Sequence, residues 1–137
     1  VNLSKGDFPF ASAQWIPKLM ADFEAGPLAK YTPCRNLDLP DTVNALAIVH
    51  TELVLIHPFR DGNGRMARML AMLMALQADL PVLDFQDIKG KKRQEYFAAV
   101  RAGVNSDYGP MKKIFEVVVE RTLSRYARKS PPASKKS

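Results

Sequence analysis

The chain has 137 residues, a single cysteine and a formal net charge of +6. This length allows one domain with a sizeable core, and a single cysteine excludes a disulfide framework and fits a reducing cytoplasm. The N-terminus shows no signal peptide, and the longest apolar run is too short and too marked by arginine to span a bilayer.

The N-terminal third predicts a hairpin followed by a helix. Residues 1–11 contain an alternation of apolar positions that is typical of part of a β-hairpin. Pro17 fits the first turn of the following helix, and Gly26-Pro27 predicts its end. The apolar residues that recur at helical spacing in this helix are Ile16, Leu19, Met20 and Phe23. A loop over residues 31–36 then leads to the next element.

A core helix, a loop and a second helix are predicted over residues 41–76. Apolar residues recur with helical periodicity over 41–56. Pro58 disfavours the α conformation for the residue before it, so we expect the helix to end at His57 and to present that side chain at its rim. The next helix should begin near Asn63, because residues 66–76 are almost entirely apolar and free of glycine and proline.

The loop between these helices has the composition of a phosphate-binding site. Gly62, Asn63 and Gly64 tolerate left-handed backbone conformations, which let successive N–H groups point into one anion-binding concavity. The N-terminus of the second helix also favours phosphate. Arg65 and Arg68 lie on one face of that helix and can bind phosphate oxygens, and two arginines indicate more than one phosphate.

Two residues of the loop can supply further chemistry. Asp61 is suited to Mg²⁺, which commonly takes one carboxylate together with substrate phosphates and water. His57 is a candidate general base, because its ordinary pKa lies near neutrality. His50 stands two helical turns upstream and is interpreted as structural, and Cys34 is expected to be inert.

Two more helices are predicted in the C-terminal half. Residues 91–102 show a helical pattern, and Pro110 is placed near the start of a last helix. Residues 129–137 are basic and rich in Ser and Pro, and they predict a disordered tail. Six of the lysines and arginines follow residue 120, without any nucleic-acid-binding motif, so no nucleic-acid partner is predicted. The methionines, four of them within 66–74, are interpreted as core filler.

The segment HPFRDGNGRMAR, residues 57–68, resembles the signature of the Fic-domain proteins. That signature reads His, any residue, Phe, any residue, Asp or Glu, Gly-Asn-Gly-Arg, two residues, Arg, and every specified position is filled. The resemblance implies an all-α, Fic-type domain over residues 1–128, in which a core helix–loop–helix carries the active-site loop 57–65. It also implies a short β-hairpin flap at about residues 1–11.

The resemblance implies transfer of AMP from ATP to a Tyr, Thr or Ser hydroxyl of a target protein. His57 would deprotonate that hydroxyl, which attacks the α-phosphate and releases pyrophosphate. Asp61 would hold Mg²⁺, and Phe59 would be a buried anchor for the loop. The phosphates would be bound by Gly62, Asn63 with its amide near the α-phosphate, Gly64, Arg65 and Arg68.

Other implied contacts are more distant from the motif. The flap of such proteins clamps the target by strand addition, and this assigns target docking to the strip Lys5–Phe10, including Lys5, Gly6, Asp7 and Phe8. Tyr96 matches the region that carries an aromatic near the adenine. The alternative for Tyr96 is a core position, since an aromatic at helical spacing is often buried.

Several alternatives remain open at this point. The Doc toxins transfer the γ-phosphate and replace the two motif glycines with Ala and Lys, so Gly62 and Gly64 favour AMP transfer. Transfer of another group, such as phosphate or UMP, and a non-catalytic nucleotide-binding module are the other candidate functions.

An inhibitory helix with Ser or Thr four positions before a Glu is absent from the sequence. A partner protein or an upstream segment would supply that helix, or the activity is unrestrained. The expected location is cytoplasmic, with delivery into a host or target cell as a variant, and no membrane partner is predicted.

Overall fold

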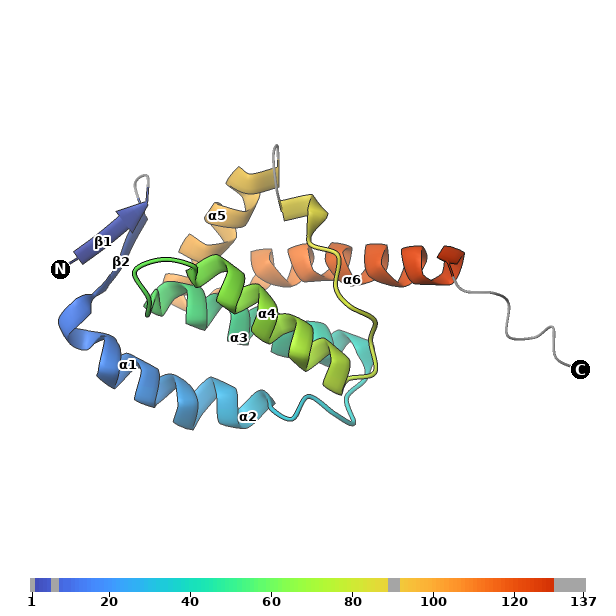
Figure 1. Ribbon diagram of the computed structural model, residues 1–137, viewed down its shortest axis with the longest axis horizontal. Helices are drawn as coiled ribbons and strands as arrows, with labels where there is room; N and C mark the ends of the chain where they lie inside the picture. Colours follow the sequence, from blue (N-terminus) through green and yellow to red (C-terminus); the bar gives the residue numbers. More distant parts are fainter. Residues whose placement is uncertain (1, 6–7, 89–91, 130–137) are drawn as a thin grey trace, which may run out of the picture.

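The computed structural model describes residues 2–5, 8–88 and 92–129 (Figure 1). The predicted helical class is confirmed. The helices are α1 (Ile16–Phe23), α2 (Ala29–Tyr31), α3 (Leu39–Ile56), α4 (Asn63–Gln77), α5 (Arg93–Ala102) and α6 (Gly109–Lys129). The strands are β1 (Asn2–Lys5) and β2 (Phe8–Ser12), and the short helical turns are η1 (Ala13–Trp15), η2 (Glu24–Leu28), η3 (Gln86–Ile88) and η5 (Gly103–Asn105).

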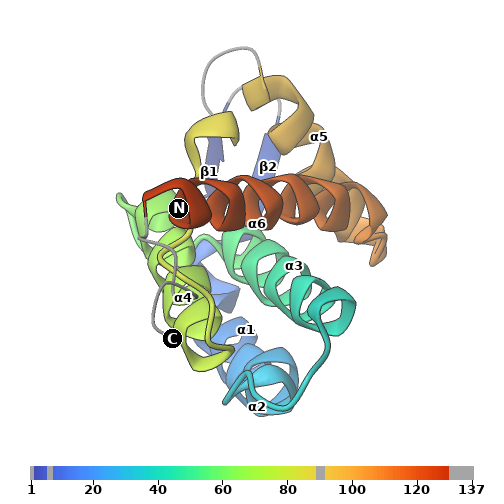
Figure 2. The same ribbon diagram turned by 90° about the vertical axis from the view of Figure 1, so that its right-hand side faces the viewer.

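Helix α3 is the centre of the fold. It packs against α1, α4, α5 and α6, and Figure 2 shows α6 crossing one side of it while α1 and α4 flank the others. Its start is capped by Asp38, whose side chain accepts a hydrogen bond from the Asp41 N–H at 2.8 Å. Among the described residues α3 is also the one helix long and apolar enough to cross a membrane, and most of it is buried in the core.

The expected helix end at Gly26-Pro27 is wrong. The chain stays helical from Ile16 to Tyr31, because the turn Glu24–Leu28 widens to a π-helix that contains Pro27. Proline lacks an N–H, and in an ordinary α-turn its ring clashes with the carbonyl four residues earlier. The wider π-turn accommodates the ring. The helix ends instead at Thr32, whose N–H and hydroxyl both bond to the Leu28 carbonyl.

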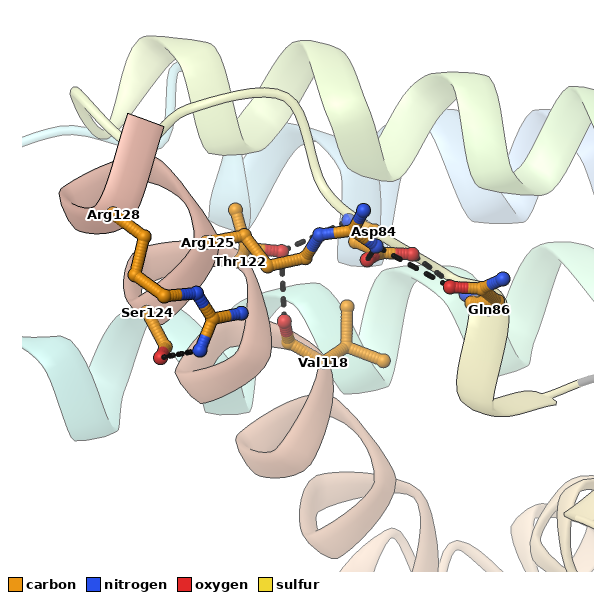
Figure 3. A network of polar contacts seen from close by, with 7 residues as sticks. All are labelled: Asp84, Gln86, Val118, Thr122, Ser124, Arg125 and Arg128. Carbon is orange, nitrogen blue, oxygen red and sulfur yellow. Dashed lines mark hydrogen bonds and ion pairs between the residues drawn. The ribbon is translucent and has the colours of Figure 1, made fainter. Parts of the chain in front are cut away.

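A polar network fixes the segment between α4 and α5 onto α6 (Figure 3). The Asp84 N–H donates to Thr122 Oγ1 at 2.8 Å, and the Thr122 hydroxyl donates to the Val118 carbonyl at 2.7 Å. Arg125 Nη1 bonds to Asp84 Oδ2 at 2.6 Å. The hydrogen bond from the Gln86 N–H is the main cause that lowers the pKa of the Asp84 carboxyl, and the bond and charge of Arg125 lower it as well. The connection therefore has a defined path although it contains little helix.

The two strands pair antiparallel at the N-terminal end of the domain, with Lys5 opposite Phe8 and Ser4 opposite Pro9. Residues 6 and 7 lie outside the described residues, so the predicted docking positions Gly6 and Asp7 do as well. At the other end, α6 continues to Lys129, one residue past the predicted domain boundary, and residues 130–137 are also outside the description.

The interpretation of the methionines as core filler is only partly right. Met74 and Met111 are buried, but Met66 is 43% exposed and Met69 is 58% exposed. Leu73 and Leu76 continue the same exposed face of α4. The physical reason is that α4 packs on α3 with one face, so the apolar residues on its opposite face stay open to solvent.

Candidate functional site

His57 lies at the point where the core helix ends. It is the C-cap of α3, with a left-handed backbone (φ 53°, ψ 59°), and its N–H still bonds to the Leu53 carbonyl at 3.2 Å. Pro58 cannot continue the helix, and the left-handed conformation turns the chain out of the helix axis. His57 is half-buried at this corner, as expected from the sequence, between the end of α3 and the loop.

Asn63 closes the loop by bonding to both backbone groups of Phe59. The Phe59 N–H donates to Asn63 Oδ1 at 2.8 Å, and Asn63 Nδ2 donates to the Phe59 carbonyl at 2.6 Å. The Asn63 side chain is buried, with 7% exposed. Its amide is therefore engaged within the loop, which sequence reasoning missed, and the backbone N–H of Asn63 is the group left for a phosphate.

The expected burial of Phe59 is wrong. Its side chain is 47% exposed, and the residue is attached to the start of α4 through the bonds of its backbone to Asn63. The loop is thus anchored by a pair of hydrogen bonds.

Only one residue of the Gly-Asn-Gly segment is left-handed. Gly62 has φ 80° and is the N-cap of α4, whereas Asn63 and Gly64 already form the first turn of that helix. No side chain caps this helix start. The first-turn N–H groups, at Asn63, Gly64 and Arg65, therefore lack helical partners and are available to an anion at the positive end of the helix dipole.

The two motif arginines fold back over the two glycines. A Cβ atom added at Gly62 would lie 3.2 Å from Arg65 Nη2, and one added at Gly64 would lie 3.1 Å from Arg68 Nη1. Glycine at both positions thus leaves room for guanidinium groups directly above the N-terminus of α4. Arg65 is exposed and Arg68 is half-buried, so the structure brings two positive charges to the same helix end as the first-turn N–H groups.

Asp61 stands on the exposed side of the loop, where its Oδ1 accepts from the Gly62 N–H at 2.9 Å. Within the described ranges, no group of three or more His, Cys, Asp or Glu side chains is arranged to hold a metal ion. A single carboxylate fits a Mg²⁺ ion that arrives with nucleotide phosphates and keeps water ligands, and it does not fit a resident ion held by protein alone.

Tyr96 lies in the core. It is 8% exposed, and its hydroxyl lies 2.6 Å from Nε2 of His50, which is 1% exposed. Burial raises the pKa of Tyr96. The structure therefore favours the core alternative for Tyr96, and His50 is structural as expected. Cys34 is buried as well, which raises the pKa of its thiol.

Comparisons with known proteins agree with this arrangement. The profile of the Fic/DOC family matches residues 1–75. The protein adenylyltransferase fic-1 of Caenorhabditis elegans is 34% identical over 86 residues, which are 63% of this chain and 16% of the relative. The protein adenylyltransferase Fic of Nematostella vectensis is 35% identical over 82 residues, 58% of this chain and 18% of the relative.

Solved structures show the same fold. The BepC protein of Bartonella tribocorum, a VirB-translocated effector crystallised with bound AMPPNP, superposes with a TM-score of 0.70 at 26% identity, covering 85% of this chain and 55% of that one. The N-terminal FIC domain of Bep8 from Bartonella sp. 1-1C gives 0.69 at 25% identity, covering 85% and 54%. The chain thus spans less than a fifth of the curated relatives and about half of these solved chains.

Proposed function

We propose that this chain, which belongs to the Fic/DOC family, is the catalytic domain of a protein adenylyltransferase that moves AMP from ATP to a hydroxyl group of a target protein. The observation that carries the proposal is that His57 stands at the left-handed end of α3 and that the loop after it, closed by the bonds between Phe59 and Asn63, leads into the uncapped N-terminus of α4 under Arg65 and Arg68. The relatives named protein adenylyltransferase and the AMPPNP-bound neighbour support the reaction and its donor.

The reaction begins with proton transfer to His57. A target Tyr, Thr or Ser hydroxyl gives its proton to the imidazole, and its oxygen forms a bond to the α-phosphorus of ATP. The bond from that phosphorus to the oxygen bridging to the β-phosphate breaks, and pyrophosphate leaves with those electrons. His57 suits this role because it stands beside the positive helix end, where the hydroxyl can approach without competing for the phosphate-binding groups.

The phosphates are bound by backbone groups and by the two arginines. The N–H groups of Asn63, Gly64 and Arg65 face the anion, and the guanidinium groups of Arg65 and Arg68 bind the outer phosphates. These groups stabilise the charge that develops on the leaving pyrophosphate. Asp61 is the residue that would hold Mg²⁺, which when bound neutralises phosphate charge.

The surroundings of the site define its partners. The β1–β2 hairpin contacts α3 through β2, and we assign it as the flap that aligns an extended target segment by strand addition, with Lys5 and Phe8 at its turn. An inhibitory helix with a Glu for Arg68 would come from a partner protein or from an upstream segment, or the activity is unrestrained. The activity is assigned to the cytoplasm, of the producing cell or of a cell into which the protein is delivered.

The test is transfer of label from ATP to protein. The purified chain is incubated with a cell lysate and either α-³²P-ATP or γ-³²P-ATP, and modified proteins are identified by mass spectrometry. Label should come from the α-phosphate alone, and His57→Ala should reduce it by about 10²- to 10⁴-fold while AMPPNP binding persists. Arg60→Ala, a change at an exposed arginine of the same loop, is the matched control and should keep the activity.

Three outcomes would contradict the proposal. Label from the γ-phosphate would mean phosphate transfer. Unchanged labelling by His57→Ala would remove the assigned base. Tight AMPPNP binding without labelling of any protein, in several lysates and on the chain itself, would support a non-catalytic nucleotide-binding module.

A further inference from the structure

A buried polar pair joins α3 to α5. His50 on α3 is 1% exposed, and its Nε2 lies 2.6 Å from the hydroxyl oxygen of Tyr96 on α5. The imidazole also meets the ring of Phe115 on α6 edge-on, with centroids 5.3 Å apart. A polar pair this deep in a small core is costly unless its hydrogen bonds are satisfied, so its chemistry requires an explanation.

The surroundings determine where the imidazole proton lies. Burial, reinforced by the positive charge of Arg68 and opposed by the Ala67 carbonyl, lowers the pKa of His50 to about 4, so the ring is neutral at pH 7. Burial raises the pKa of Tyr96, so its hydroxyl keeps a proton that has to be donated, and Nε2 is the acceptor in reach. The ring proton is therefore on Nδ1.

The second nitrogen of His50 is unpartnered among the described residues. Nδ1 is buried and has no hydrogen-bond partner in the described part of the chain, and the Ala67 carbonyl on α4 is the backbone group that raises the pKa of this imidazole. An Nδ1–H directed toward that carbonyl would extend the Tyr96–His50 hydrogen bond to the backbone of α4. Ala67 is itself buried and directly precedes Arg68.

We propose that the His50–Tyr96 pair is a positioning device that holds the first turns of α4 and so places Arg68 for the outer phosphates of the nucleotide. The nature of the ligand rests on the proposed function. A neutral pair is the chemistry this place requires, because a buried carboxylate would bind the Arg68 guanidinium and a charged imidazole would repel it. His50 and Tyr96 act through Arg68 and do not touch the substrate.

The first test measures AMPPNP binding by calorimetry in the full chain. Tyr96→Phe removes only the hydroxyl and should weaken AMPPNP binding about fivefold, the equivalent of one hydrogen bond. In an Arg68→Ala background the same change should have no further effect on Kd. The matched control is Tyr108→Phe, which removes a hydroxyl that donates to Glu52 Oε2 at 2.5 Å. Arg68 takes no part in that bond, so the change should leave Kd unchanged. Equal effects of Tyr96→Phe with and without Arg68 would overturn the proposal.

The second test needs no variant and no activity. Long-range ¹H–¹⁵N spectra of the ¹⁵N-histidine-labelled chain should show His50 as the neutral Nδ1–H tautomer with a slowly exchanging proton. An Nε2–H tautomer, or a charged ring at pH 7, would overturn the proposal even if Tyr96→Phe fails to fold. Loss of AMP transfer with AMPPNP binding and this tautomer intact would count against the proposed function alone.

Discussion

Replacement of Asn63 should open the motif loop without unfolding the domain. The side chain makes two hydrogen bonds to Phe59, at 2.8 and 2.6 Å, and these are what attach the exposed Phe59 to the start of α4. At about 1 kcal/mol each, loss of both in Asn63→Ala lowers the stability of the closed loop by about 2 kcal/mol. This corresponds to roughly a thirtyfold fall in the ratio of closed to open loop.

The smaller fraction of closed loop should appear both as weaker AMPPNP binding and as faster hydrogen exchange of the loop amides. AMPPNP affinity is measured by calorimetry, and opening of the loop by amide hydrogen exchange at residues 57–62, with urea unfolding as the measure of global stability. Asn63→Asp keeps the acceptor for the Phe59 N–H but loses the donor to the Phe59 carbonyl. The new carboxylate should also repel that carbonyl oxygen, so this variant should weaken the closed loop as well. Asn105→Ala, at an exposed asparagine of η5, is the matched control and should change none of these.

Asn63 does not hold the loop closed if Asn63→Ala binds AMPPNP as well as the parent chain and exchanges its loop amides no faster. The same conclusion follows if global stability falls by the full amount while the loop itself does not open, because Asn63 would then be an ordinary core residue. A thirtyfold loss that is confined to the loop and to nucleotide binding is the expected outcome.

The remaining two predictions concern packing and pH. A Cβ atom at Gly103 would lie 2.2 Å from the Thr51 methyl group on α3, so Gly103→Ala should lower the free energy of unfolding by about 1–3 kcal/mol, whereas Gly26→Ala, with nothing within 4 Å, should leave it unchanged or raise it. Equal urea midpoints for the two variants would contradict this. The lowered pKa of Asp84 means that its ionised form stabilises the fold above pH about 4, its unfolded pKa, and that this contribution is lost as pH falls through the lower folded pKa. Asp84→Asn should therefore destabilise the chain at pH 7 and much less at pH 2, and a penalty that does not change with pH would refute the assignment.

The helix–loop–helix and its chemistry follow from the sequence because they depend on local rules. The apolar periodicity over residues 41–56, the proline at 58 and the glycine at 62 each restrict the backbone over a few residues, and together they place His57 at a helix end before a glycine turn that starts the next helix. Motif residues that are neighbours in the chain are neighbours in space for the same reason. The family could therefore be inferred from twelve consecutive residues.

Tertiary structure decided the features that depend on what each side chain meets. Asn63 bonds to Phe59 and Phe59 stays exposed, Tyr96 turns inward to His50, and the outer face of α4 lacks a partner among the described residues. Each of these depends on which helices pack together and on which face of each helix is covered, which local periodicity does not specify. Likewise, Gly26-Pro27 reads as a helix end, and only the widened turn around Pro27 lets the chain remain helical to Tyr31. The sequence determined the motif and its backbone, while the packing of α3 against its neighbours determined which side chains of the loop region stay exposed and which are buried.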